Sequence, residues 1–161
     1  MGVEIERKFL VSGDAWRGAG PREVIRQGYL STDPDRIVRV RRSDDRGFFT
    51  VKGRAAGARR TEIEFEIPHA QADELMTLCK GAIVEKIRHH AQHAGHEWVI
   101  DEFSGNNAGL VVAELEVGDE SEFERALAAP PGWLGRDVTD DARLSNSALS
   151  ERPFASWSDA E

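Results

Sequence analysis

The sequence has 161 residues, of which 40% are hydrophobic and 31% are charged, so it has enough apolar side chains for the core of one domain. Its 29 acidic residues outnumber its 21 Lys and Arg, which gives a formal charge of -8 and argues against a nucleic-acid-binding surface. The single cysteine, Cys79, excludes an internal disulfide. Because the first residues are charged and no run of eighteen apolar residues occurs, we expect a cytoplasmic protein that does not bind a membrane.

Alternating or β-rich segments and the turn residues between them predict a chain composed mainly of strands. In chain order we expect strands at 3–11, 23–31, 36–42, 47–53 and 60–67, a helix at about 69–80 that stops at Gly81, strands at 82–90, 97–103 and 110–117, a helix from 120 to about 128, and a third helix from near Asp140 toward Ser150. Asp140 or Thr139 is the expected cap of the third helix. The sequence therefore predicts a single α+β domain, residues 1–153, that is mainly antiparallel β, followed by a peripheral tail, residues 154–161.

The predicted strands place apolar side chains on one face and charged side chains on the other. In the third strand Arg39 and Arg41 flank Val40, and six other strands repeat the pattern. One arrangement is an ordinary sheet whose charged face lies in water. The other is a closed, eight-stranded barrel with a charged lumen, whose outer apolar faces are covered by the helices and by a partner. We favour this tunnel because so many strands share the pattern.

A charged lumen needs compensation, because an unpaired buried ion costs several kcal/mol. Pairing of Glu with Arg across the lumen is one solution. The other is a bound polyanion held by Arg and Lys, together with divalent cations held by Glu and Asp. Guanidinium groups match phosphate oxygens in pairs, and clustered carboxylates are typical ligands of Mg²⁺ or Mn²⁺. The residue types favour the second solution.

The charged positions carry a family resemblance. Glu4-x-Glu6-x-Lys8 resembles the ExExK signature of the CYTH superfamily, the triphosphate tunnel metalloenzymes. The likeness continues in order through Gln27-Gly28-Tyr29-Leu30, Arg39-x-Arg41, Lys52-Gly53, Glu62-x-Glu64-x-Glu66, Lys86-x-Arg88, Asp101-x-Phe103, Glu114-x-Glu116 and Arg143-x-x-Asn146. ExExK alone is a weak signal, whereas the ordered set is specific. The resemblance implies an eight-stranded antiparallel tunnel.

The resemblance also implies hydrolysis of a triphosphate with one or two Mg²⁺ or Mn²⁺ ions. The acids that match the family's metal ligands are Glu4, Glu6, Asp101, Glu114 and Glu116, and the bases that match its phosphate-binding residues are Arg39, Arg41, Lys52, Lys86 and Arg88. Lys8 would bind substrate and neutralise the leaving oxygen, with Tyr29 beside it as a catalytic partner. Glu62 and Glu64 are either partners of the bases Arg39 and Arg41 or additional metal ligands.

The chain resembles the short bacterial inorganic triphosphatases, so we expect inorganic tripolyphosphate as substrate, cleaved to pyrophosphate and phosphate. Hydrolysis of thiamine or nucleoside triphosphates, or cyclisation of ATP, are the alternatives within the family. A polyphosphate-binding module without turnover is the alternative from another class. A homodimer is left open.

Overall fold

The computed structural model describes residues 5–54 and 60–157. These residues form nine strands: β1 (Ile5–Val11), β2 (Arg22–Ser31), β3 (Arg36–Ser43), β4 (Arg46–Gly53), β5 (Glu62–Ile67), β6 (Lys80–His93), β7 (His96–Phe103), β8 (Val111–Val117) and β9 (Leu134–Asp137). The α-helices are α1 (His69–Met76), α2 (Glu120–Ala128) and α3 (Asn146–Glu151), and short 3-10 turns lie at Gly105–Asn107, Ala142–Leu144 and Phe154–Ser156. The α+β, mainly antiparallel architecture is as predicted. Within the described part of the chain no helix is long and apolar enough to cross a membrane.

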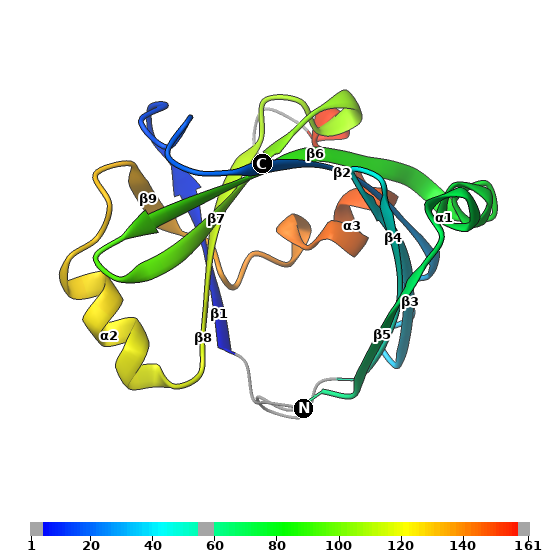
Figure 1. Cartoon of the computed structure of the whole chain (residues 1–161), viewed down its shortest axis with the longest axis horizontal. Helices are drawn as coiled ribbons and strands as arrows, with labels where there is room; N and C mark the ends of the chain where they lie inside the picture. The colour runs from blue at the N-terminus through cyan, green and yellow to red at the C-terminus, as the bar shows by residue number, and fades with distance from the viewer. Residues whose placement is uncertain (1–4, 55–59, 158–161) are drawn as a thin grey trace.

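All nine strands belong to one antiparallel sheet in the order β5-β4-β3-β2-β6-β7-β8-β1-β9. The sheet curves strongly, so that its two ends turn toward each other around α3 (Figure 1). In the described residues the edge strands β5 and β9 are not hydrogen-bonded to each other, so the predicted closed barrel is not confirmed. At the β1 side of the sheet, β9 pairs with Phe9 and Val11 and forms the edge. The sequence pattern missed β9, which has four mostly exposed residues and no alternation.

The convex face of the sheet is apolar, as the alternation predicts, and two helices cover it. Helix α2 packs Phe123 and Ala126 against a cluster that includes Leu115 of β8 and Trp98 of β7. Helix α1 packs Ala72 and Met76 around Val40 of β3. Both helices lie outside the curved sheet (Figure 1). Burial of these apolar side chains, worth about 25 cal/mol per Å² removed from water, holds the two helices on the convex face.

Helix α3 lies inside the curve of the sheet, so the expectation that the helices pack outside is wrong for this one (Figure 1). Its Leu149 joins Leu144, Val84 of β6 and Val112 of β8 in a buried apolar cluster, against which Phe154 and Trp157 of the C-terminal segment also pack. The helix is also shorter than predicted. Ser145 caps it by accepting a hydrogen bond from the Ala148 amide at 3.2 Å, in place of the predicted Asp140 or Thr139.

Gly81 is not the stop signal of the first helix that the sequence predicts. Helix α1 ends at Met76, and Gly81 lies in β6 with a φ of +70°. A Cβ atom added there would lie 2.4 Å from the Ser150 carbonyl oxygen. Gly81 is therefore required because α3 approaches the β6 backbone closely inside the curve.

Alanine at Gly81 tests this close approach. Gly18 has nearly the same φ, +71°, but no atom lies within 4 Å of its added Cβ, so it reports the conformational cost alone. We expect Gly18→Ala to lower the free energy of unfolding by about 1 kcal/mol, and Gly81→Ala by about 3 kcal/mol because the helix must also shift. Urea unfolding followed by circular dichroism measures both. Equal losses in the two variants would show that α3 does not press on Gly81.

Candidate active site

The charged side chains lie on the concave face of the sheet. Val84 and Val112 contact α3 inside the curve. Lys86 and Glu114 follow them by two residues on the same strands and so point to the same side. The antiparallel register then places polar and charged residues of neighbouring strands side by side on this face: Tyr29 with Arg39, Gln27 with Arg41, Lys52 with Glu62, Arg88 with Asp101, Lys8 with Glu114 and Glu6 with Glu116. One curved surface therefore carries the described residues that the resemblance assigns to the site.

Arg39 lies at the centre of the basic end of this surface. Its side chain is 10% exposed, and its Nη2 donates to Thr50 Oγ1 at 3.2 Å and to Glu64 Oε2 at 3.1 Å. Its Nε is buried and has no hydrogen-bond partner in the described structure. A buried guanidinium donor without an acceptor is costly, and an anion placed on this surface would satisfy it.

Arg41 and Lys52 crowd more positive charge around Arg39. Burial, together with repulsion from Arg39 and Arg88, lowers the pKa of Arg41 to about 10. Its Nε donates at 2.9 Å to the amide oxygen of Gln27, a neutral acceptor that leaves the positive charge uncompensated. Burial and repulsion from Arg39 likewise lower the pKa of Lys52. The lowered pKa values show that burial and mutual repulsion destabilise the protonated forms of Arg41 and Lys52. A bound polyanion would offset this repulsion.

Glu62 and Glu64 are in contact with these bases. Glu64 accepts from the Thr50 hydroxyl at 2.6 Å as well as from Arg39, and Glu62 lies 3.7 Å from Lys52 Nζ. Burial opposes the charged form of Glu64, but the Thr50 hydrogen bond and Arg39 outweigh it and lower its pKa. These contacts are those of ion-pair partners, the first of the two alternatives for the pair.

Lys86, Arg88 and Asp101 form a buried ion triad in the middle of the sheet. Asp101 Oδ2 accepts from Lys86 Nζ at 2.9 Å and from Arg88 Nη2 at 3.0 Å, and its Oδ1 accepts from Arg88 Nε at 2.9 Å. Burial favours the neutral acid, but the two cations outweigh it and hold the pKa of Asp101 well below its usual range. Both oxygens of this expected metal ligand are thus engaged by bases.

Glu114 and Glu6 lie at the other, acidic end of the surface. Burial, together with the neighbouring Glu6 carboxyl, raises the pKa of Glu114 to about 8, so Glu114 is mainly in its neutral form at pH 7. Lys8 Nζ lies 3.9 Å from Glu6. Glu116 pairs with Glu6 across the strands, whereas Glu4 lies outside the described residues.

This carboxylate set fits a divalent cation in its chemistry. Hard oxygen donors are the ligands of Mg²⁺ and Mn²⁺, and a cation can take the place of the proton that Glu114 carries. In residues 5–54 and 60–157 no three His, Cys, Asp or Glu side chains converge as a complete ligand group. The fit therefore rests on the raised pKa of Glu114 next to Glu6 and on the donor type.

Tyr29 and Lys8 lie on strands that β6, β7 and β8 separate in the sheet. The Tyr29 hydroxyl accepts a hydrogen bond from Gln27 Nε2 at 3.2 Å, and burial raises its pKa. These contacts join Tyr29 to the basic end of the surface, whereas Lys8 lies beside Glu6 and Glu114 at the acidic end. The expected pairing of Lys8 with Tyr29 stays a prediction.

These side chains are positioned by four polar residues that were not assigned to the site from the sequence. Gln27 and Thr50 are fully buried and hold Arg41 and Arg39. Thr139 Oγ1 accepts from the Lys8 amide at 3.0 Å and so fixes the backbone of β1. The fourth, Asn146, contacts Lys86 from α3. Gln27 and Thr50 were detectable, because they share the alternation of the charged residues.

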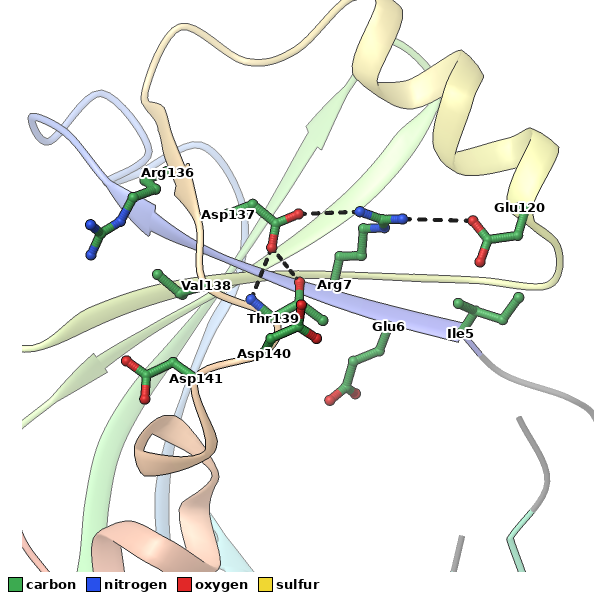
Figure 2. A pocket seen from close by; sticks show the side chains of 10 residues that line it. All are labelled: Ile5, Glu6, Arg7, Glu120, Arg136, Asp137, Val138, Thr139, Asp140 and Asp141. Atoms are coloured by element: carbon green, nitrogen blue, oxygen red, sulfur yellow. Dashed lines mark hydrogen bonds and ion pairs between the residues drawn. The ribbon is translucent and has the colours of Figure 1, made fainter. Parts of the chain in front are cut away.

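An acid-rich hollow of about 680 Å³ lies beside β1 and reaches Glu6 (Figure 2). Arg7 spans it, with its guanidinium 3.2 Å from Asp137 and 3.8 Å from Glu120, while Glu6 points to the other side of the strand (Figure 2). Asp137 also accepts from the Thr139 amide at 2.9 Å. The carboxylates of Asp137 and Glu120 therefore serve to attach the neighbouring segments to β1.

Magnesium binding beside Glu6 should release the proton that Glu114 carries. Because Glu114 is protonated below a pH of about 8, we expect the apparent affinity for Mg²⁺ to rise as the pH increases from 6 to 8 and then to level off. Calorimetric titration of Mg²⁺ in two buffers of different ionisation enthalpy measures both affinity and proton release. Glu114→Gln should weaken binding and abolish proton release, whereas Glu120→Gln, in the outer hollow, should change neither. A pH-independent affinity in the wild-type protein would contradict the role of this pair.

Comparison with known proteins identifies the family of this chain. The model of the CYTH domain matches residues 2–145. The chain is 45% identical over 158 residues to an inorganic triphosphatase of Acetivibrio thermocellus, covering 98% of this chain and 99% of that protein, and 36% identical over 152 residues to an inorganic triphosphatase of Nitrosomonas europaea, covering 92% and 97%. The crystal structure of the inorganic triphosphatase NE1496 superimposes with a TM-score of 0.72 at 33% identity, covering 93% of this chain and 95% of that one. The chain belongs to the CYTH domain family.

Proposed function

We propose that the protein is a divalent-metal-dependent triphosphatase that hydrolyses inorganic triphosphate to pyrophosphate and phosphate. Two relatives that match nearly the whole chain are inorganic triphosphatases. The observation that carries the proposal is the crowded basic end of the concave surface, where Arg39 keeps a buried donor without an acceptor. Inorganic triphosphate is a compact polyanion with the charge density that such a surface requires.

The bases of this surface have the task of binding and orienting the phosphate chain. Arg39, Arg41 and Lys52 would hold one end of the chain, and Arg88 would reach it from the middle of the sheet. Charge neutralisation and positioning provide most of the catalysis in phosphoryl transfer, which involves little covalent chemistry by the protein. Glu62, Glu64 and Gln27 would keep the bases oriented before substrate arrives, so that less reorganisation is needed during the reaction.

The carboxylates Glu6, Glu114 and Glu116, with Glu4 from the N-terminal segment, would hold Mg²⁺ or Mn²⁺. When bound, such an ion neutralises phosphate oxygens and activates water. Lys8, which lies beside these acids, would neutralise charge on the leaving oxygen. The hydrogen bond from Gln27 orients the Tyr29 hydroxyl, which would donate to substrate oxygens near Arg39. Asp101 would act on the bases, by holding Lys86 and Arg88 in place.

Arginine-to-alanine variants on the same strand test the role of the basic surface. Arg39→Ala should lower kcat/KM for tripolyphosphate about a hundredfold or more, because it removes a preorganised donor from the phosphate site. Arg36→Ala is the matched control, since Arg36 is exposed and pairs only with the neighbouring Asp33 among its described contacts. Phosphate release with Mg²⁺ is measured for both variants, together with their thermal unfolding. Similar activity in the two folded variants would refute the assignment of the phosphate site.

A substrate panel distinguishes the proposed activity from its alternatives. We expect phosphate release from tripolyphosphate to exceed that from ATP, thiamine triphosphate and pyrophosphate, each tested with Mg²⁺ and with Mn²⁺. Formation of cyclic nucleotide and pyrophosphate from ATP would instead identify a cyclase. Tight binding of tripolyphosphate without any turnover would identify a binding module and overturn the proposal.

A further inference from the structure

Lys86 is the most completely enclosed cation on the concave surface. Its side chain is 0% exposed, and its ammonium donates to Asp101 Oδ2 at 2.9 Å and to Asn146 Oδ1 at 3.0 Å. The ammonium also lies 5.6 Å from the centre of the Phe103 ring. An ammonium has three protons to donate, so its direction is determined by the acceptors around it. One of these acceptors comes from the same sheet, and the other comes from α3.

Asn146 reaches Lys86 because the C-terminal segment is held inside the curve of the sheet. It is the first residue of α3, directly after the capping residue Ser145. Leu144 and Leu149 on either side are buried against Val84, which precedes Lys86 by two residues on the same face of β6. The closeness of the backbones at Gly81 fixes the same helix at a second point. The Asn146 amide therefore occupies a fixed position over Lys86.

We propose that Asn146 is a positioning residue for the phosphate site, which holds the Lys86 ammonium in place and so makes α3 part of the basic surface. This inference rests on the proposed function. Asp101 is shared between Lys86 and Arg88, and its two oxygens accept three hydrogen bonds. A second acceptor on Lys86 keeps the ammonium at its own side of Asp101 and leaves Arg88 in its two-bond contact with the carboxylate. Loss of Asn146 would let Lys86 and Arg88 rearrange around Asp101.

A purely structural role for Asn146, as a fastener of α3, makes a different prediction. In that case removal of the amide lowers stability, and any change in activity is independent of Lys86. A positioning role requires that the effect on activity pass through Lys86. The two roles are therefore separated by a double-mutant cycle, in which the coupling between two residues is measured directly.

The cycle consists of the wild-type protein, Asn146→Leu, Lys86→Met and the double variant. Leucine keeps the branched shape of the Asn146 side chain but has no acceptor, and methionine keeps much of the length of Lys86 but has no charge. Ser147→Ala, on the same turn of α3, is the matched control because its hydroxyl contacts Ser145 and lies outside the Lys86 contacts. We measure kcat and KM for tripolyphosphate with Mg²⁺, the Kd of tripolyphosphate in EDTA by calorimetry, and thermal unfolding.

We expect Asn146→Leu to lower kcat/KM about tenfold, as for loss of a hydrogen bond to a charged group, and to weaken metal-free tripolyphosphate binding. In the Lys86→Met background the same change should alter kcat/KM less than twofold, and Ser147→Ala should match the wild type. Equal effects of Asn146→Leu in both backgrounds, or wild-type activity in Asn146→Leu, would overturn the positioning role. If the wild-type protein releases no phosphate from tripolyphosphate, the proposed function itself fails.

Discussion

The balance of charge on the concave face is the constraint on which the rest of this structure depends. Ions without partners would cost several kcal/mol each on this partly buried surface. Asp101 compensates Lys86 and Arg88 together, and Glu64 compensates Arg39. Arg41 donates to an amide. The network therefore pairs many of these ions, but it leaves an excess of positive charge at one end that a phosphate chain would neutralise.

The curvature of the sheet gives this network its arrangement. In the strand order, β1 and β8 carry the acidic pair Glu6 and Glu114, while β3 and β4, on the other side of β2, β6 and β7, carry Arg39 and Lys52. A flat sheet would keep these groups far apart. Because the sheet curves, its concave side brings the strands that carry the acidic end round toward those that carry the basic end (Figure 1). A metal held by the acids and a phosphate chain held by the bases would therefore meet there.

The apolar side chains of the sheet lie mainly on its convex face and the charged side chains on its concave face, which affects what covers each face. Apolar side chains point outward, so α1 and α2 are needed to cover β3 and the β7–β8 region. They do not extend over β5, where Ile63 is 58% and Phe65 is 51% exposed. On the concave side, Leu149 of α3 packs with Val84 and Val112 of the sheet in an apolar cluster. Asn146 lies where this apolar cluster meets the charges, which is why it can influence Lys86.

The sequence by itself determined β1 to β8 and the face on which their charged residues lie, because alternation with period two is a local property, whereas β9 lacks it. Gln27 and Thr50 share that alternation, so the signal that would have found them was present, although they were not assigned to the site. Only the tertiary structure determined that the edges of the sheet stay unpaired with each other in the described residues and that α3 lies inside the curve. It also determined that Gly81 must lack a Cβ atom, because α3 approaches the backbone there. The contact between Lys86 and Asn146 joins residues 60 positions apart. No local pattern encodes such a contact, since it exists only after the C-terminal segment has packed into the curved sheet.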